Sequence, residues 1–174
     1  MLPKPPKGGV DLSFNPIREG WSIYTTKDLA LIKIRQILMR IVLLSTPEDG
    51  SGRLAASGSL AFAVVSPDKG PPDSRQYTAE QIVQAITQPH VEYDTVKEDW
   101  NEYDAEGVGI GVKVVATNIA KTRLFDGMGE PIYWVNYQIV VRPITTPEDK
   151  AKLQKIWSER GPKQPTPTPA HATR

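Results

Sequence analysis

Residues 107–143 combine strand residues, a turn and more strand residues, and this pattern predicts one long β-hairpin. The first strand carries valine or isoleucine at every second position from Val108 to Val114. The second, residues 132–141, is rich in β-branched and aromatic side chains. Residues 126–131 between them are dense in turn formers. We therefore predict a β-rich α+β protein with a mainly antiparallel sheet, built as a sandwich or a partly open barrel.

Residues 28–45 fit two patterns. Apolar side chains occupy both odd and even positions, as in a strand that is buried on both faces. Ile34, Leu38 and Ile41 also share one stripe of a helix, so periodicity alone leaves both alternatives open. The high content of isoleucine, together with the strand-rich remainder, favours a strand.

Two helices are predicted from their end signals. The internal helix spans about residues 79–88, with Thr78 as the N-cap and Pro89 as the stop. The C-terminal helix spans about residues 147–160, with Thr146 as the N-cap and Pro147 at the first position.

The domain organisation follows from where the prolines lie. Residues 1–20 and 161–174 are rich in proline and predict two extended arms. Residues 21–160 then form a single β-rich domain with an acidic insertion at 46–106. No internal repeat is apparent in the chain.

Charge is unevenly distributed along the chain, although the net charge is +1. Residues 1–45 carry +4, residues 46–106 carry −8 and residues 107–174 carry +5. A domain that binds nucleic acid through its whole surface would be basic throughout, which this chain is not. Either the acidic segment folds over the basic ones within the chain, or it is a solvated loop, or it docks on the basic face of a neighbour.

The usual sets of catalytic residues are missing from the sequence. The chain has no cysteine and two histidines, and the glycines at 107, 109 and 111 are not spaced as a dinucleotide loop requires. We therefore expect a non-enzyme with no cofactor. The N-terminus has no secretory signal pattern and no apolar run is long enough to span a membrane, which predicts a cytoplasmic or virion-associated protein.

Aromatic and proline residues outside the expected core are candidates for contacts with another protein. Trp134, Asn136 and Tyr137 lie on the second strand of the hairpin, and the first two of these share its more polar face. Two more aromatic residues lie in the acidic run 92–106, and the C-terminal arm contributes two prolines. The complete set of interface candidates is Trp134, Asn136, Tyr137, Trp100, Tyr103, Pro165 and Pro167.

Two alternative sites remain open. Aromatic residues on a sheet can stack on single-stranded nucleic acid, and here the candidates are Lys121, Arg123, Trp134 and Arg142. Oxygen-bearing side chains can bind Ca²⁺ or Mg²⁺, and the weak candidates, for a binding module or a small enzyme, are Asp99, Asn101 and Asp104. Tyr103 stands where a third calcium ligand belongs, which argues against a calcium loop.

The hypothesis that accounts for most of these features is a non-enzymatic structural or assembly subunit of a larger complex, with a viral or filamentous assembly as one setting. Its partners would be other copies of itself or other protein subunits. The terminal arms would lie across neighbours, and complementary charge blocks would meet between them.

Overall fold

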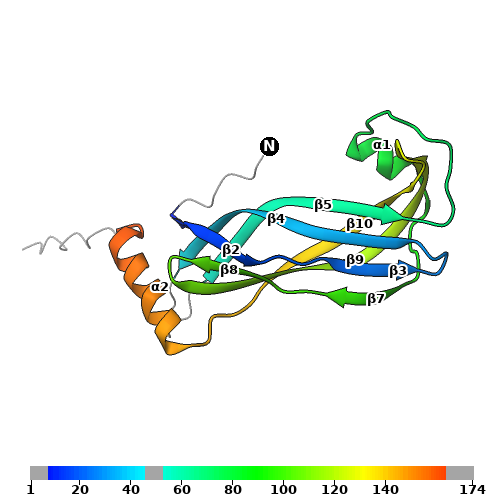
Figure 1. The fold of residues 1–174 in the computed structure, drawn as a ribbon. Coiled ribbons are helices and arrows are strands. Elements are labelled where there is room, and N and C mark those ends of the chain that lie inside the picture. Colours follow the sequence, from blue (N-terminus) through cyan, green and yellow to red (C-terminus); the bar gives the residue numbers. More distant parts are fainter. Residues whose placement is uncertain (1–7, 46–52, 164–174) are drawn as a thin grey trace, which may run out of the picture.

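The computed structural model describes residues 8–45 and 53–163, and it shows two antiparallel β-sheets packed face to face with a helix at each end (Figure 1). The first sheet contains β1 (Val10–Leu12), β3 (Ser22–Thr26), β4 (Leu31–Ser45), β5 (Arg53–Val65) and β7 (Tyr93–Glu98). The second contains β2 (Phe14–Arg18), β6 (Ile86–Gln88), β8 (Asn101–Ala105), β9 (Val108–Phe125) and β10 (Pro131–Val141). The helices are α1 (Ala79–Gln84) and α2 (Pro147–Arg160).

The predicted fold class is confirmed, and so are the long hairpin, made of β9 and β10, and the C-terminal helix. Residues 31–45 are a strand, as the isoleucine content indicated. A turn at residues 27–30 separates this strand from β3, and Leu29 in that turn has a positive φ of 64°.

The N-terminal arm predicted over residues 1–20 is not free where the structure describes it. Residues 10–12 pair with β4, and residues 14–18 pair with β8. Val10 and Leu12 bury their side chains in the core. Pro16 resists a central strand, but it is compatible with β2 because β2 lies at the edge of its sheet.

Two further predictions need correction. The internal helix ends at Gln84 rather than near residue 88, because residues 86–88 pair with β9 as strand β6. The acidic segment 92–106 is not a loop on the surface, because it contains β7 and β8. In β8 the side chains of Asn101, Tyr103 and Ala105 point inward, and the acidic residues between them face outward.

An internal repeat, which the sequence analysis did not find, organises the whole molecule. The order of elements in β1–β2–β3–β4–β5–α1 recurs as β6–β7–β8–β9–β10–α2. The pairings recur as well: β4 pairs with β1, β3 and β5, and β9 pairs with β6, β8 and β10. Residues 14–24 and 93–103 also align without a gap, sharing glutamate, tryptophan and tyrosine at the same three positions.

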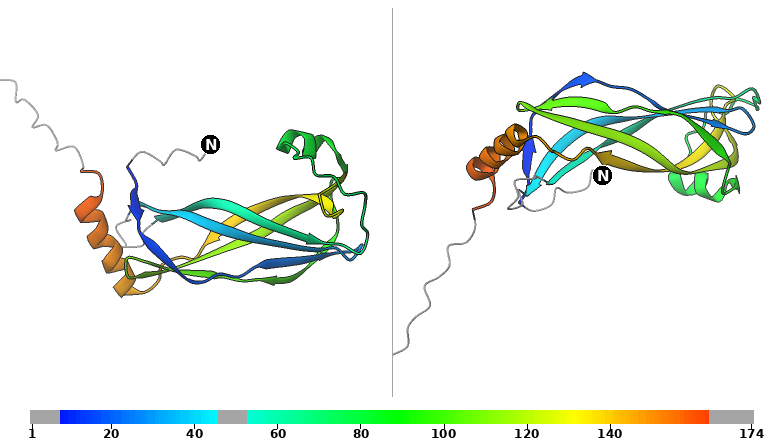
Figure 2. Two further views of the ribbon diagram at one scale, coloured as in Figure 1. Left: turned by 45° about the horizontal axis from the view of Figure 1, so that its top comes forward. Right: turned by 90° about the horizontal axis from the view of Figure 1, so that it is seen from below.

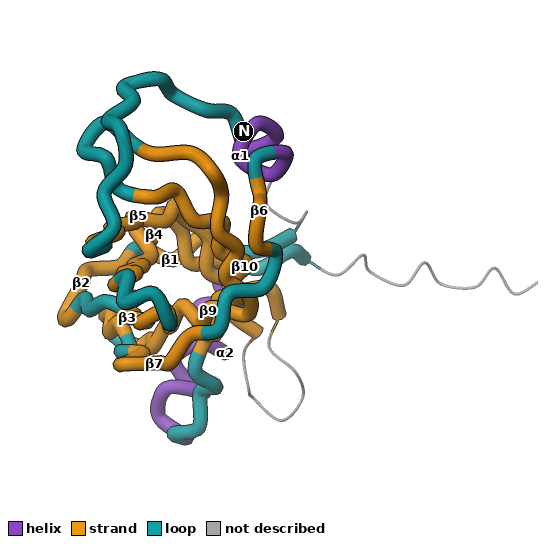
Figure 3. The backbone as a smooth tube through the Cα atoms, turned by 90° about the vertical axis from the view of Figure 1, so that its right-hand side faces the viewer, coloured by secondary structure: helices purple, strands orange, loops and turns teal. Residues whose placement is uncertain are grey.

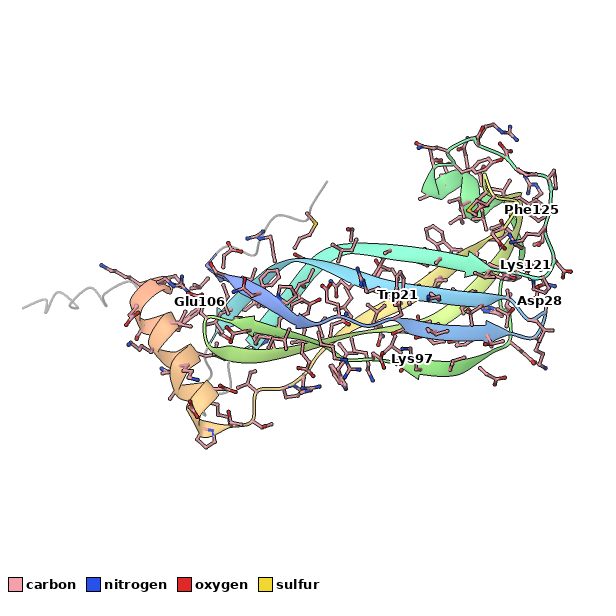
Figure 4. All side chains as sticks on the ribbon, viewed as in Figure 1. Trp21, Asp28, Lys97, Glu106, Lys121 and Phe125 are labelled. Atoms are coloured by element: carbon pink, nitrogen blue, oxygen red, sulfur yellow. The ribbon has the colours of Figure 1, made fainter. Side chains whose placement is uncertain are left out.

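The two halves exchange one strand each. β2 belongs to the first half but completes the second sheet beside β8, and β7 belongs to the second half but completes the first sheet beside β3. The chain passes between the sheets near Gly20 and Asp99, close to Trp21 in the middle of the molecule (Figure 4). The Gly20 amide donates a hydrogen bond of 2.6 Å to Asn101 Oδ1. A Cβ at Gly20 would lie 2.7 Å from an Asp99 carboxylate oxygen, so this crossing requires glycine.

The core is divided into two clusters, one toward each end of the molecule. One contains Tyr103 and the α2 residue Leu153, and the other contains Tyr24 and Tyr133. α1 and α2 lie at opposite ends of the elongated sandwich (Figure 2). Because each cluster draws side chains from both sheets, the two halves share one folded body.

Candidate functional site: an open groove between β5 and β10

A hollow of the described surface opens where the edges of the two sheets meet. Within the described chain, β5 pairs with β4 alone and β10 pairs with β9 alone, so each strand keeps one free edge. A cavity of about 660 Å³ lies along these edges and reaches α1. Figure 3 shows β5, β10 and α1 around this end of the molecule. The lining residues are Leu60, Phe62 and Val64 of β5, Ile82 of α1, Asp126, and residues 131–137.

Aromatic side chains dominate the β10 wall of this groove. Tyr133 is buried, whereas Tyr137 on β10 and Phe62 on β5 are 44% and 48% exposed. Trp134 is half-buried, and its indole Nε1 donates a hydrogen bond of 2.9 Å to Asn136 Oδ1. Exposed aromatic rings next to a free backbone edge are typical of a surface that another chain covers.

The two free edges carry no charged side chain that would oppose pairing with another strand. Residues 54–65 and 131–141 contain no charged side chain, and Pro131 is the one proline in these segments. An uncharged edge is a template for an added strand unless charges, bulges or a covering element block it. The acid in the groove lining is Asp126, and its carboxylate accepts hydrogen bonds from the amides of Met128 and Glu130.

The seam, the line along which the edges of β5 and β10 meet, differs at its other end. There the residues are aliphatic: Leu54 and Ala56 of β5, and Ile139 and Val141 of β10. They belong to the same apolar cluster as Leu153, Ile156 and Trp157 of α2. The helix α1, which corresponds to α2 in the internal repeat, has six residues and buries none of them in the described structure. The groove is therefore the end of the seam whose helix adds no buried side chain to the core.

The structure brings three interface candidates together and separates the others. Trp134, Asn136 and Tyr137 all line the groove. Trp100 lies at the crossing between sheets instead, with Lys113 and Arg142 stacked on its ring at 4.9 and 4.6 Å. Pro165 and Pro167 lie outside the described residues.

Tyr103 is a core residue, so its assignment to an interface is wrong. Its side chain is 1% exposed, and its hydroxyl donates a hydrogen bond of 3.1 Å to Glu19. The acidic neighbours that suggested an exposed position point to the other side of β8, since successive side chains of a strand alternate.

The nucleic-acid candidates do not form one basic patch. Lys121 lies near one end of the molecule and forms an ion pair with Asp28 (Figure 4). Arg142 donates to Glu102 at 2.8 Å and its backbone pairs with Gly111, ten residues before Lys121 on β9, or about 33 Å along the strand. Arg123 approaches the Gln84 carbonyl oxygen at 3.5 Å.

Asp28 and Lys121 stabilise each other in their charged forms. Partial burial opposes ionisation of Asp28, yet hydrogen bonds from Lys121 and Thr26 outweigh burial and hold the pKa of Asp28 below its usual value. The hydrogen bond to Asp28 in turn raises the pKa of Lys121. Both groups are therefore charged at neutral pH and neutralise each other.

The metal candidates also point in different directions. The Asn101 side-chain oxygen is taken up by the Gly20 amide, and Asp104 lies on the opposite face of β8. Asp99 accepts from Lys97 at 3.0 Å. In residues 8–45 and 53–163, no group of three or more His, Asp or Glu side chains is arranged to hold a metal ion.

Sequence reasoning missed the β5 side of the groove. Leu60, Phe62 and Val64 lie on one face of a strand whose partner across the seam, β10, is far away in sequence. The sequence feature that could have indicated this wall of the groove is the uncharged stretch 54–65, in which these three side chains alternate with small ones.

Comparison with protein families, with curated proteins and with solved structures finds no match to this chain. What is established is the class: a β-rich α+β sandwich with an aromatic groove along its open seam. None of the helices in the described part is long and apolar enough to cross a membrane.

Proposed function

We propose that the protein is a non-enzymatic assembly subunit that receives another protein chain in the groove between β5 and β10. The observation that supports this most strongly is the pair of uncharged free edges flanking exposed Phe62 and Tyr137. Covering these rings removes apolar surface from water, and the free backbone groups can pair with an incoming segment. Copies of the chain or other protein subunits are the partners, and a filament or a virion shell is a setting that uses such contacts.

In this proposal the contact between subunits is made by the groove between β5 and β10 and not by complementary charge blocks. Acidic residues of segment 92–106 form ion pairs within the chain: Glu98 with Lys113, Glu102 with Arg142, and Glu106 with Arg160. These pairs fit the alternative in which the acidic segment folds over basic parts of the same chain. We therefore expect association to depend on apolar contact and only weakly on salt.

The test is the mass of the full-length protein by light scattering over a range of concentration and salt. We expect a mass above that of the 19.3 kDa monomer that rises with concentration. The double variant Phe62→Ser/Tyr137→Ser should return it to the monomer, because it removes the two exposed rings. Both side chains are half-exposed, so the fold should survive, which circular dichroism checks.

A matched control is Val96→Ser on β7, which removes an apolar side chain that is 58% exposed and lies outside the groove lining. It should leave the mass unchanged. A full-length protein that stays monomeric at every concentration and salt would argue against self-assembly. Equal loss of mass in both variants would argue against the groove as the contact.

A further inference from the structure

We infer that the groove is occupied by residues 165–169, Pro-Thr-Pro-Thr-Pro, of a second copy of the chain. This inference rests on the proposed function and names the segment that docks. The contact would be head-to-tail, because the groove of one copy meets the C-terminal segment of the next. Repetition of such a contact gives a ring if the rotation closes and a filament if it does not.

The lining of the groove differs from the other end of the seam in a way that favours proline. The other end has the aliphatic side chains Leu54, Ile139 and Val141, whereas the groove has the rings of Phe62 and Tyr137 with Trp134 beside them. Grooves lined with aromatic side chains are a common recognition surface for proline-rich segments, whose stiffness reduces the entropy lost on binding.

The alternation of proline and threonine would let this segment pair with the free edge of one strand only. In an extended chain, Pro165, Pro167 and Pro169 would project from one face, so all three rings could lie on the aromatic wall. The amides of the intervening threonines would point to one side, and the opposite side would have no donors because proline has no N–H. Such a segment can pair with one edge strand and cannot template another strand beyond it.

Chain geometry favours a second copy over the same copy. Pro162 lies beside Gly8, because a Cβ built on Gly8 would be 3.5 Å from its ring. This is the end of the sandwich where β1 and β5 pair with β4 through Leu43, opposite Leu54. From Leu54 to Phe62 is about 27 Å along β5. Pro169, seven residues after Pro162, reaches about 24 Å as an extended strand, so the prolines of the same chain stop short of Phe62.

Charge is also complementary. The acid of the groove lining is Asp126, whereas the charged side chains of the C-terminal segment are Lys163 and Arg174, both basic. The attraction is weak at physiological salt, but it favours this segment over an acidic one.

The test uses the full-length chain carrying Pro165→Ala, Pro167→Ala and Pro169→Ala together, called here the tail variant. We expect it to be folded and monomeric where the wild-type chain associates. A fluorescently labelled peptide of residues 161–174 should bind the tail variant, as measured by anisotropy. Adding Tyr137→Ser should weaken that binding about tenfold or more, as loss of a central aromatic contact does. Adding Val96→Ser should leave it unchanged, and a peptide with the three prolines replaced by alanine should not bind.

The outcomes separate this inference from the proposed function. If the tail variant still associates while Phe62→Ser/Tyr137→Ser does not, the groove docks another segment, and the inference is overturned while the function stands. If the wild-type chain is monomeric and the peptide binds only the tail variant, the tail of the same copy fills the groove, which also overturns the inference. A monomeric wild-type chain together with no peptide binding would reject both.

Discussion

At the scale of single residues, the two halves are joined by a pair of equivalent tyrosines. Tyr24 donates a hydrogen bond of 2.8 Å to Glu98, and Tyr103 donates one of 3.1 Å to Glu19, so each tyrosine binds a glutamate of the other half. Both rings are buried, and each meets a second aromatic ring edge-on, Tyr93 for Tyr24 and Phe14 for Tyr103. Burial, reinforced by the glutamate, raises the pKa of Tyr24 to about 12 and also raises the pKa of Tyr103.

These raised pKa values predict a loss of stability in alkali. A tyrosine in the unfolded chain ionises near pH 10, whereas buried Tyr24 ionises near pH 12. Its contribution is therefore complete below pH 10 and is lost as the pH rises toward 12. For Tyr24 alone the loss is on the order of 2–3 kcal/mol, since one pKa unit corresponds to about 1.4 kcal/mol. Urea unfolding between pH 8 and 11.5 measures it.

The control is Tyr24→Phe/Tyr103→Phe, which keeps the rings and removes both ionisable hydroxyls. It should be less stable than the wild-type chain at pH 8, because Glu98 and Glu19 lose a donor, but its stability should fall less between pH 10 and 11.5. Lysines titrate equally in both proteins. Parallel pH curves for the two proteins would contradict the assignment.

Gln36 shows what a residue pattern can miss. A helix over residues 28–45 would place Gln36 opposite the apolar stripe of Ile34, Leu38 and Ile41, but β4 buries it completely between the two core clusters. Within the described structure its side-chain amide has no hydrogen-bond partner. Composition alone assigns glutamine to the surface, and only the tertiary fold places this one inside.

At the scale of elements, α2 contributes a buried side chain to the core, whereas α1 contributes none in the described structure. Leu153 is fully buried, so Leu153→Ala should lower the free energy of unfolding by about 2–5 kcal/mol, from lost burial and the cavity that remains. Ile82→Ala on α1 should cost about 1 kcal/mol or less, because α1 buries no residue in the described structure. Urea unfolding of both variants at pH 7 gives the comparison, and similar losses would contradict the difference between the helices.

The elements that the sequence predicted well are those with strong local signals. The hairpin alternates over many residues, and α2 has a threonine N-cap followed by proline. The sequence did not predict β1, β2 and β6, because strands of three to five residues carry little periodicity and their partner strands are remote in the chain. Strand formation there depends on pairing, which local pattern does not report.

At the scale of the whole molecule, the internal repeat was readable in principle. The aligned segments 14–24 and 93–103 contain the signal, but the remainder of the halves differs in turn length and in the size of the helix. The aromatic wall of the groove was predicted from Trp134, Asn136 and Tyr137. Its opposite wall was not, because the meeting of β5 with β10 follows from the packing of two sheets.

The strand exchange predicts how the chain behaves when it is cut. Residues 1–68 and 69–174, separated in the exposed loop after β5, each lack a strand of their own sheet and part of each core cluster. We expect neither fragment to unfold cooperatively alone, and the two together to form a stable complex. Circular dichroism with urea, on each fragment and on the mixture, measures this. A fragment that folds by itself would contradict the prediction.

The exchange of β2 and β7 also determines when each sheet can be completed during folding. Neither sheet can be completed until segments far apart in the chain have met, so much loop-closure entropy must be lost before these contacts form, and folding should be slow for a chain of this length. At high concentration the missing strand can come from a second molecule instead. The topology that locks the two halves together is thus also the route by which two chains become entangled before either is complete.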